Sequence, residues 1–349
     1  MPTDAALCAL RDAGQSYRQI ATSLNLSVGG VRGRVSRYRR KQKPTEFNTG
    51  GIQAEKNSVR DNVLPFAVLP RRPCPTTDIE CWKDTLQSLT NRKQFIVVSH
   101  LCDIHFPNHD SAALNLAYRL IARKQPDIIV VGSDTADFSL ISHFDKDPDA
   151  DEQIDDELDE LRRYWIPHID TLNCLAPKAA LVFIAGNHCQ RIYDSVAESA
   201  PKLRKTIERA WIDLISYQHR VMWIGRTEEV EIGGLLVKHG SATNEHAAKT
   251  MLEAESYQVS VMAGHIHRLT AYHRAGRRYP VSAITSGALC KIPQPYEKRP
   301  PKRAHQWGTA FATVDLRGTF VAFDNVEFQR AGGQLIAVSG GDVLQQAAG

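Results

Sequence analysis

Five short motifs in the chain contain the residue types that bind metal ions and move protons. Mixed carboxylate, imidazole and amide ligands suit Mn, Fe or Zn and disfavour a thiolate site. Side chains at positions i and i+2 of an extended backbone point the same way, so a D-x-H or H-x-H pair could hold one ion or two neighbouring ions. In chain order the motifs are Asp103-Ile104-His105, Gly132-Ser133-Asp134-Thr135-Ala136-Asp137, Gly186-Asn187-His188, His239-Gly240 and Gly264-His265-Ile266-His267.

Each motif follows a short apolar run that we expect to be a β-strand. One motif alone is weak, because an Asp after a strand is commonly a cap or turn residue. Ligands bind beyond the carboxyl ends of parallel strands, so five motifs in this arrangement are expected to converge on one metal site. The runs are residues 95–99, 128–131, 180–185, 235–238 and 259–263.

Amphipathic segments between these runs predict helices. Strands that alternate with helices indicate an α/β layered domain, and a strand-rich later half predicts a second sheet packed on the first. The expected helices are 111–124, 154–172 and segments within 193–219, and the expected later strands are 221–223, 281–284, 310–314 and 320–323.

Residues 1–43 are expected to form a small all-α helix-turn-helix module, with helices at 5–12, 17–24 and 28–40. Nine Lys and Arg against two Asp give this segment a balance of +7, whereas the whole chain carries +4. A basic last helix is typical of a module that enters the major groove of DNA. The alternative is a basic tail that only promotes solubility or contacts a partner. The candidate DNA contacts are Arg32, Arg34, Arg37, Arg39, Arg40 and Lys41.

The remaining boundaries follow from composition. Residues 44–76 are rich in Pro, Gly and Asn and predict a flexible linker. Residues 77–330 are expected to form a catalytic domain, and residues 331–349 a C-terminal tail.

The seven cysteines are scattered and include no C-x-x-C pair, so we expect reduced thiols. No apolar run approaches the roughly 20 residues that span a bilayer. We therefore expect a cytoplasmic protein that has no membrane partner.

The ordered series D-x-H, G-x-D-x-x-D, G-N-H, H-G and G-H-x-H resembles the calcineurin-like metallophosphoesterase superfamily over roughly residues 94 to 325. Residues 137–148, 286–290 and 307–311 also resemble members found in phages and prophages. The resemblance implies a four-layer α/β/β/α sandwich with a two-metal site at the strand ends. A phage or prophage origin would place the protein in a bacterial host cytoplasm.

Carried over to this chain, the resemblance implies two divalent metal ions, with Mn as the first choice and Fe, Zn, Ni or Mg as alternatives. Two such ions can clamp a phosphoryl group and generate a bridging hydroxide as the nucleophile. One ion would be held by Asp103, His105 and His267, the other by Asn187, His239 and His265, and Asp134 would bridge them.

Four further residues have implied roles around that site. His188 would act near the leaving oxygen as a general acid or a positive charge. Asp137 would orient a ligand His or the loop. Arg191 is a candidate phosphate contact, and His143 could line the site.

Two positions depart from the family pattern. Ser133 stands where Gly usually precedes the bridging Asp, and Cys189 stands where an acid usually follows G-N-H. An acid there can orient the preceding His and raise its pKa, so His188 would be a weaker acid here; alternatively, Cys189 is a plain core residue.

The leading functional hypothesis is a metal-dependent phosphodiesterase, a nuclease acting on DNA. One alternative is a phosphoesterase for small molecules, either cyclic nucleotides or monoesters, with an incidental N-terminus. The other is a DNA-binding regulatory or accessory protein with a weakened site that uses its metals structurally. The sequence does not predict an oligomeric state.

Overall fold

The computed structural model describes most of the predicted catalytic domain and part of the N-terminal module. The described residues are 2–12, 17–24, 26–31, 34–35, 79–138, 141, 154–218, 220–224, 229–275, 280–294 and 305–347. Several predicted site residues lie outside these ranges, namely His143, Arg32, Arg37, Arg39, Arg40 and Lys41.

The larger of two sheets has eight strands in the order β13-β12-β11-β10-β1-β2-β3-β4. Its parallel half supplies three of the five motifs, because β1 pairs with β2 and β2 with β3 in parallel. The parallel strands are β1 (Phe95–Leu101), β2 (Ile128–Gly132), β3 (Ala180–Ile184) and β4 (Met222–Trp223). The antiparallel strands are β10 (Trp307–Asp315), β11 (Val321–Ala331), β12 (Gln334–Ser339) and β13 (Asp342–Ala347).

The smaller sheet has five strands in the order β5-β6-β7-β9-β8. The strands β6, β7 and β9 run parallel to one another, so the residues after β6 and β7 leave the same edge. The strands are β5 (Glu229–Ile232), β6 (Leu235–Lys238), β7 (Ser260–Ala263), β8 (Leu269–Arg274) and β9 (Val281–Ser286).

Alternation along β2 shows how the layers form. Ile129 and Val131 face a core shared with helices, whereas Ile128 and Val130 face a core between the two sheets. A strand buried on both faces is apolar throughout, which is why this run shows no polar alternation. The first core packs the larger sheet against α6 (Ser111–Lys124), α7 (Ile154–Leu175), α8 (Asn187–Ser199) and α9 (Arg204–Ser216), with the short 3₁₀ helix Pro201–Leu203 before α9.

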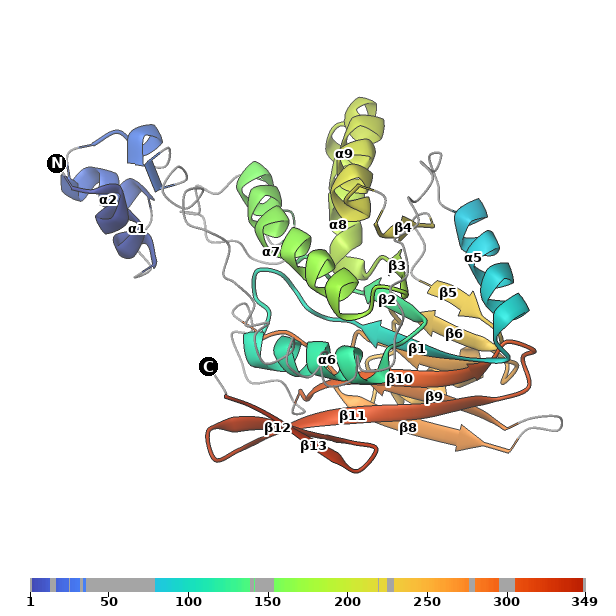
Figure 1. The fold of residues 1–349 in the computed structure, drawn as a ribbon. Coiled ribbons are helices and arrows are strands. Elements are labelled where there is room, and N and C mark those ends of the chain that lie inside the picture. The colour runs from blue at the N-terminus through green and yellow to red at the C-terminus, as the bar shows by residue number, and fades with distance from the viewer. Residues whose placement is uncertain are drawn as a thin grey trace.

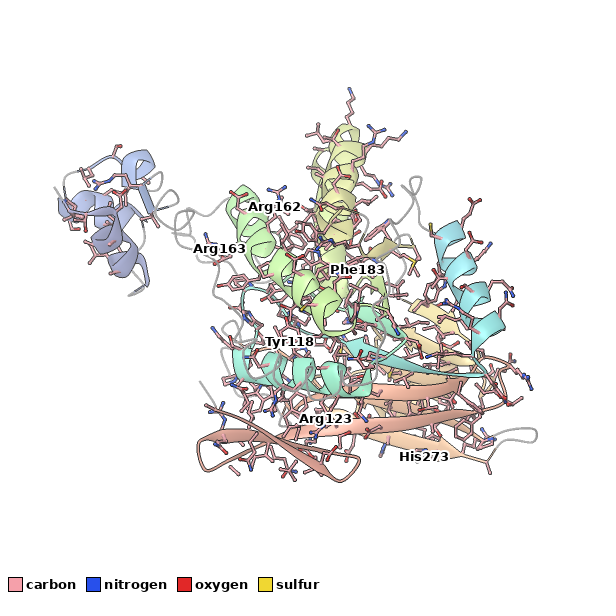
Figure 2. The ribbon with its side chains drawn as sticks, viewed as in Figure 1. Tyr118, Arg123, Arg162, Arg163, Phe183 and His273 are labelled. Atoms are coloured by element: carbon pink, nitrogen blue, oxygen red, sulfur yellow. The ribbon has the colours of Figure 1, made fainter. Side chains whose placement is uncertain are left out.

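The layers are visible in the ribbon (Figure 1), with helices above the larger sheet and the smaller sheet on its other face. Tyr118 of α6 and Phe183 of β3, labelled in Figure 2, belong to the core under the helices. The outer face of the smaller sheet packs against α10 (Ala247–Ala254). The architecture is a mixed α/β fold with two sheets and helices packed on their outer faces.

Helix α5 (Ile79–Arg92) precedes β1, and its Trp82 packs into the core between the sheets. The expected C-terminal tail is wrong for residues 334–347. These residues form the hairpin β12–β13, which continues the larger sheet and buries Leu335 and Leu344 beneath the helices. The Gly340-Gly341 pair and the alternating apolar positions on both sides of it are typical of a β-hairpin, so this hairpin could have been predicted from the sequence.

The N-terminal segment contains α1 (Asp4–Asp12) and α2 (Tyr17–Leu24), followed by helical residues at 28–31 and 34–35. Leu7, Ile20 and Val31 are buried together in its core. The Ser27 hydroxyl accepts a hydrogen bond from the Gly30 backbone N–H at 3.0 Å, so Ser27 caps the helical residues that follow. These features agree with a small helical module, and the helix-turn-helix assignment stays a prediction.

One cysteine departs from the expectation of reduced thiols. Cys81 is disulfide-bonded, whereas Cys102, Cys174, Cys189 and Cys290 are free. Scattered cysteines without a repeated spacing gave no warning of this disulfide. The cytoplasmic expectation rested partly on thiols and loses that support. Separately, no helix within the described ranges has the length and apolar character needed to cross a membrane.

Candidate metal centre

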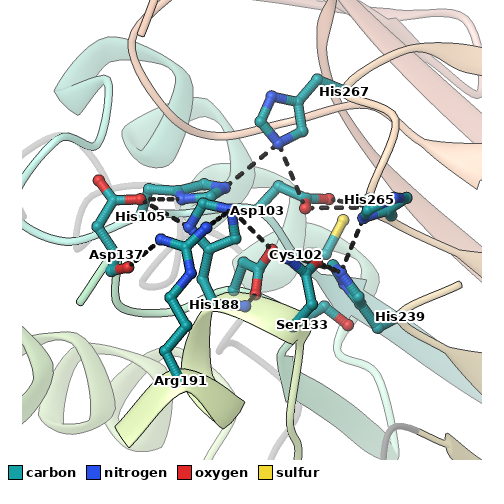
Figure 3. A network of polar contacts seen from close by, with 12 residues as sticks. Cys102, Asp103, His105, Ser133, Asp137, His188, Arg191, His239, His265 and His267 are labelled. Atoms are coloured by element: carbon teal, nitrogen blue, oxygen red, sulfur yellow. Dashed lines mark hydrogen bonds and ion pairs between the residues drawn. The ribbon is translucent and has the colours of Figure 1, made fainter. Parts of the chain in front are cut away.

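The five motifs meet where the strand ends of the two sheets approach each other (Figure 3). Ligand atoms of Asp103, His105 and Asp134 lie within 4.8 Å of one another, and so do those of Asp134, His239 and His265. Two further predicted ligands attach to these groups. His267 contacts His105, and Asn187 contacts His239. All seven predicted metal ligands are therefore in one connected cluster.

Five of these ligand residues adopt a left-handed backbone, with φ between 50° and 73°. This conformation costs a residue with a side chain roughly 1–2 kcal/mol, and it persists only where the surroundings hold it. Backbone hydrogen bonds between the loop after β1 and the loop after β2 stabilise this conformation. The backbone N–H of Asp103 donates to Ser133 O at 2.7 Å, and that of His105 donates to Asp134 O at 2.9 Å. The residues concerned are Asp103, His105, Asp134, His265 and His267.

Two glycines of the motifs let backbone approach the buried carboxylates. A Cβ at Gly186 would overlap the Asp134 carboxylate, and a Cβ at Gly264 would overlap that of Asp103. Backbone N–H groups that follow these glycines donate hydrogen bonds to the same carboxylates. The His188 N–H donates to Asp134 at 2.7 Å, and the His265 N–H donates to Asp103 at 3.0 Å. These close contacts explain why the first position of G-N-H and of G-H-x-H is a glycine, since a side chain there would overlap a carboxylate.

The cluster around His239 has the donor set of a cation site. Its Nε2 lies 2.7 Å from Asn187 Oδ1, 3.0 Å from His265 Nδ1 and 3.4 Å from Asp134 Oδ2. A ring nitrogen can donate only one hydrogen, so most of these facing lone pairs stay unsatisfied without a cation. The other nitrogen, Nδ1, is buried without a hydrogen-bond partner among the described residues. These residues fit a divalent metal ion.

The cluster around His267 fits a second ion in the same way. Its Nε2 lies 3.2 Å from Nε2 of His105 and 3.5 Å from Asp103 Oδ1. Two imidazole nitrogens and a carboxylate oxygen thus face one another in a buried space. Asp134 is the residue shared by a ligand group of each half.

The electrostatics keep the carboxylates ionised. Burial alone would raise the pKa of Asp103, but the hydrogen bond and charge of His267 hold that pKa below its ordinary value. The pKa of Asp134 is also lowered, because neighbouring histidines outweigh its burial. Burial alone would lower the pKa of His105, but the Asp137 carboxylate 2.6 Å away raises that pKa to about 9. The two carboxylates therefore stay charged, as metal ligands must be.

Asp137 joins the predicted ligands to the predicted acid. Its Oδ1 faces Nδ1 of His105 at 2.6 Å and Nδ1 of His188 at 3.1 Å, and its Oδ2 accepts from Asn108 at 2.8 Å. A carboxylate partner places the ring proton on Nδ1 of both histidines, which leaves the His105 Nε2 lone pair for a metal. Asn108 was not predicted as a site residue, because it belongs to none of the five motifs.

Arg191 contacts both His188 and Asp137. Its guanidinium is 3.1 Å from His188 Nε2, and it donates to the Asp137 carbonyl oxygen at 2.8 Å. Arginine has donors only, so Nε2 of His188 accepts in this arrangement and carries no proton. His188 is thus placed beside the cluster with its lone pair turned to Arg191.

The two departures from the family pattern have different surroundings. Ser133 has φ of 47°, and its hydroxyl lies 3.1 Å from Nε2 of the buried His100, whose Nδ1 is 3.4 Å from the Ser286 hydroxyl. Burial lowers the pKa of His100 to about 4, so this ring is neutral. Cys189 is enclosed in the core under the helices, and burial raises the pKa of its thiol to about 12. Cys189 is a core residue.

Of the remaining predicted site residues, only Arg34 lies within the described part of the chain. His143 and five of the six candidate DNA contacts lie outside the described residues. The sixth, Arg34, donates to Asp4 at 2.6 Å and to the carbonyl oxygen of Pro2 within the N-terminal module. Its guanidinium is held by these partners, and no local pattern predicts that pairing across thirty residues.

No protein-family model matches the chain, and no curated protein matches its sequence. Among solved structures it is similar to Vps29 from Chaetomium thermophilum, free and complexed with the RaPID-derived cyclic peptide RT-D3. Each comparison has a TM-score of 0.38 and 9% identity, and covers 74% of this chain and 100% of that chain. A likeness at this level does not assign a family. The chain is a mixed α/β protein whose loops build a candidate metal centre between two sheets.

Proposed function

We propose that this chain is a two-metal-dependent phosphoesterase and, more specifically, a phosphodiesterase that cleaves DNA. The observation that carries the proposal is the meeting of carboxylate, amide and imidazole ligand atoms from five loops in one cluster. Divalent ions bound there would supply an activated water and neutralise charge on a phosphoryl group.

The ligand groups support a division into two ion sites. Asp103, His105 and His267 would hold one ion. Asn187, His239 and His265 would hold the other. Asp134 belongs to a group on each side, which supports a bridging role.

The side chains beside the ions would bind the substrate. Arg191 is half-buried and holds a positive charge next to His188, so it can contact a phosphate oxygen. A phosphate that draws Arg191 away frees Nε2 of His188. That nitrogen can then hold a proton near the leaving oxygen, while Asp137 keeps the ring oriented through Nδ1.

The choice of DNA as substrate rests on the +7 balance of residues 1–43, which would attract a polyanion. A cytoplasmic location, in a bacterial host for a phage-derived chain, belongs to the same proposal. The pairing of Arg34 with Asp4 removes one candidate DNA contact and favours the second candidate function, a phosphoesterase for small molecules with an incidental N-terminus.

A substrate panel with added Mn²⁺ tests the proposal. Wild-type protein should hydrolyse a chromogenic bis-aryl phosphate and DNA faster than an aryl monoester. Asp134→Asn should reduce turnover by more than about 100-fold, because even residues that only orient ligands cost 10–100-fold. Hydrolysis of the monoester alone would favour the small-molecule function, and an inactive wild type that still binds Mn²⁺ would contradict the enzyme assignment.

A further inference from the structure

A buried thiol lies behind one of the proposed ligands. Cys290 follows β9, and its Sγ is 3.8 Å from Nδ1 of His267. The ligand atoms of His105, His267 and Cys290 lie within 4.8 Å of one another. Cys290 is not among the site residues predicted from the sequence.

The two nitrogens of His267 have unlike surroundings. Nε2 faces the proposed ion site, 3.2 Å from His105 Nε2 and 3.5 Å from Asp103 Oδ1. A lone pair can point into that site only if the ring proton is on Nδ1. Within the part of the chain that the structure describes, Cys290 Sγ is the hydrogen-bond partner of Nδ1.

The loop that contains Cys290 is fixed against the site. The Leu289 N–H donates to Asp103 O at 3.1 Å, and the Lys291 N–H donates to Asn108 O at 2.8 Å. The indole N–H of Trp307 donates to the Cys290 carbonyl oxygen at 2.9 Å. The sulfur is therefore held in place from both sides and by β10.

We propose that Cys290 is a positioning residue for the metal centre: its sulfur accepts the Nδ1 proton of His267 and so turns the Nε2 lone pair toward the ion. The inference rests on the proposed function only in requiring that the centre binds metal. A thiol can donate as well as accept, so it can also donate to Nδ1 in the metal-free protein.

The two imidazole ligands proposed for this ion are thus oriented by unlike partners. His105 is held by a carboxylate at 2.6 Å, and His267 by a thiol at 3.8 Å. Partners of this kind fix the tautomer and ring orientation of a ligand histidine. Sulfur is a weak acceptor, so the support it gives should be smaller than that of Asp137.

Metal titrations of full-length variants test the proposal without any activity assay. Cys290→Ala should weaken binding of one of two Mn²⁺ ions by about tenfold and leave the other unchanged. Cys290→Ser should recover part of the loss, because the hydroxyl can accept but lies farther from Nδ1. Cys174→Ala is the matched control, since Cys174 is an exposed cysteine on α7, and it should bind both ions as wild type does.

Co²⁺ loading gives the second readout. The proposal predicts no sulfur-to-cobalt charge-transfer band in wild type, because the sulfur contacts the imidazole and not the ion. Such a band, lost in Cys290→Ala, would overturn the positioning role in favour of direct ligation. Equal binding of both Mn²⁺ ions by Cys290→Ala and wild type would overturn it as well.

The outcomes also separate this inference from the proposed function. A wild type that binds two ions but hydrolyses no phosphate ester would remove only the proposed function, and the Cys290 comparison would still decide. A wild type that binds no ion would overturn both. If Cys290→Ala fails to fold, Cys290→Val, which also has no acceptor, carries the same comparison, and binding equal to that of Cys174→Ala would then refute the role.

Discussion

Asp137→Asn changes charge and donor pattern with little change in shape, so it isolates the part that this carboxylate plays. In the wild type, its two oxygens face three hydrogen-bond donors, on His105, His188 and Asn108. An amide has one oxygen and one NH₂ group. In one orientation the NH₂ opposes the Asn108 amide; in the other it opposes both imidazole Nδ1 atoms and drives their protons to Nε2.

The second orientation removes the His105 lone pair from the ion site, and the first breaks a charge-assisted hydrogen bond. A hydrogen bond to a charged group contributes about 1.5–3 kcal/mol. That loss corresponds to about 10- to 100-fold in metal affinity, since roughly 1.4 kcal/mol is tenfold. We therefore expect Asp137→Asn to bind Mn²⁺ about 10- to 100-fold more weakly than wild type.

Isothermal titration of metal-stripped protein with Mn²⁺ measures this difference directly. Asp194→Asn is the matched control, because Asp194 is an exposed carboxylate on α8, the helix that contains His188, and this change should leave the affinity unchanged. Circular dichroism should show that both variants are folded. An Asp137→Asn affinity within about twofold of wild type would refute the claim that this carboxylate fixes the ligand tautomers.

Three further changes test other parts of the account. Ser133→Ala and Ser133→Gly both lose the hydrogen bond to His100, but only Gly relaxes the positive φ, so we expect Gly to be more stable in urea by about 1 kcal/mol. A more stable Ala variant would contradict this reason. Burial, followed by the charge of His109, lowers the pKa of His168 from 6.5 to about 3, so its neutral form stabilises the fold above pH 6.5 and that stability is lost as pH falls toward 3. The His168→Asn side chain can still accept a hydrogen bond from the Tyr118 hydroxyl but does not titrate. Between about pH 7.5 and about pH 5, this variant should therefore lose about 2 kcal/mol less unfolding free energy than wild type. An equal loss for the two proteins in urea titrations would refute this reasoning. Deleting residues 1–43 should weaken DNA binding at physiological salt and leave hydrolysis of a small diester unchanged; undiminished DNA binding would favour the small-molecule function.

The sequence predicted the strand ends and their convergence because both follow from local pattern. Apolar runs such as residues 128–131 were recognisable as buried strands. The polar residues after such strands were expected to lie close together, because the carboxyl ends of parallel strands meet at the same edge of a sheet. The helix α2 matches its predicted bounds, since a helical face of Ile20, Ala21 and Leu24 is visible in sequence.

Long-range pairings were not predictable in the same way. Cys290 reaches His267 only because a loop is pinned to Asp103 and Asn108, and that pairing has no periodicity. The Ser133 contact with His100 joins side chains of neighbouring strands that spacing alone does not bring together. The β12–β13 hairpin is a different kind of miss, because its turn glycines were visible and were assigned to a tail.

The stoichiometry of Mn²⁺ bound to wild type and to Asp134→Asn, measured by equilibrium dialysis and elemental analysis, tests the central claim most directly. Asp134 is the residue that the two ligand groups share, so its carboxylate should be needed for a two-ion centre. We predict two tightly bound ions per wild-type chain and loss of at least one in Asp134→Asn. A wild type that binds none, or an Asp134→Asn variant that retains both with equal affinity, would contradict the assignment.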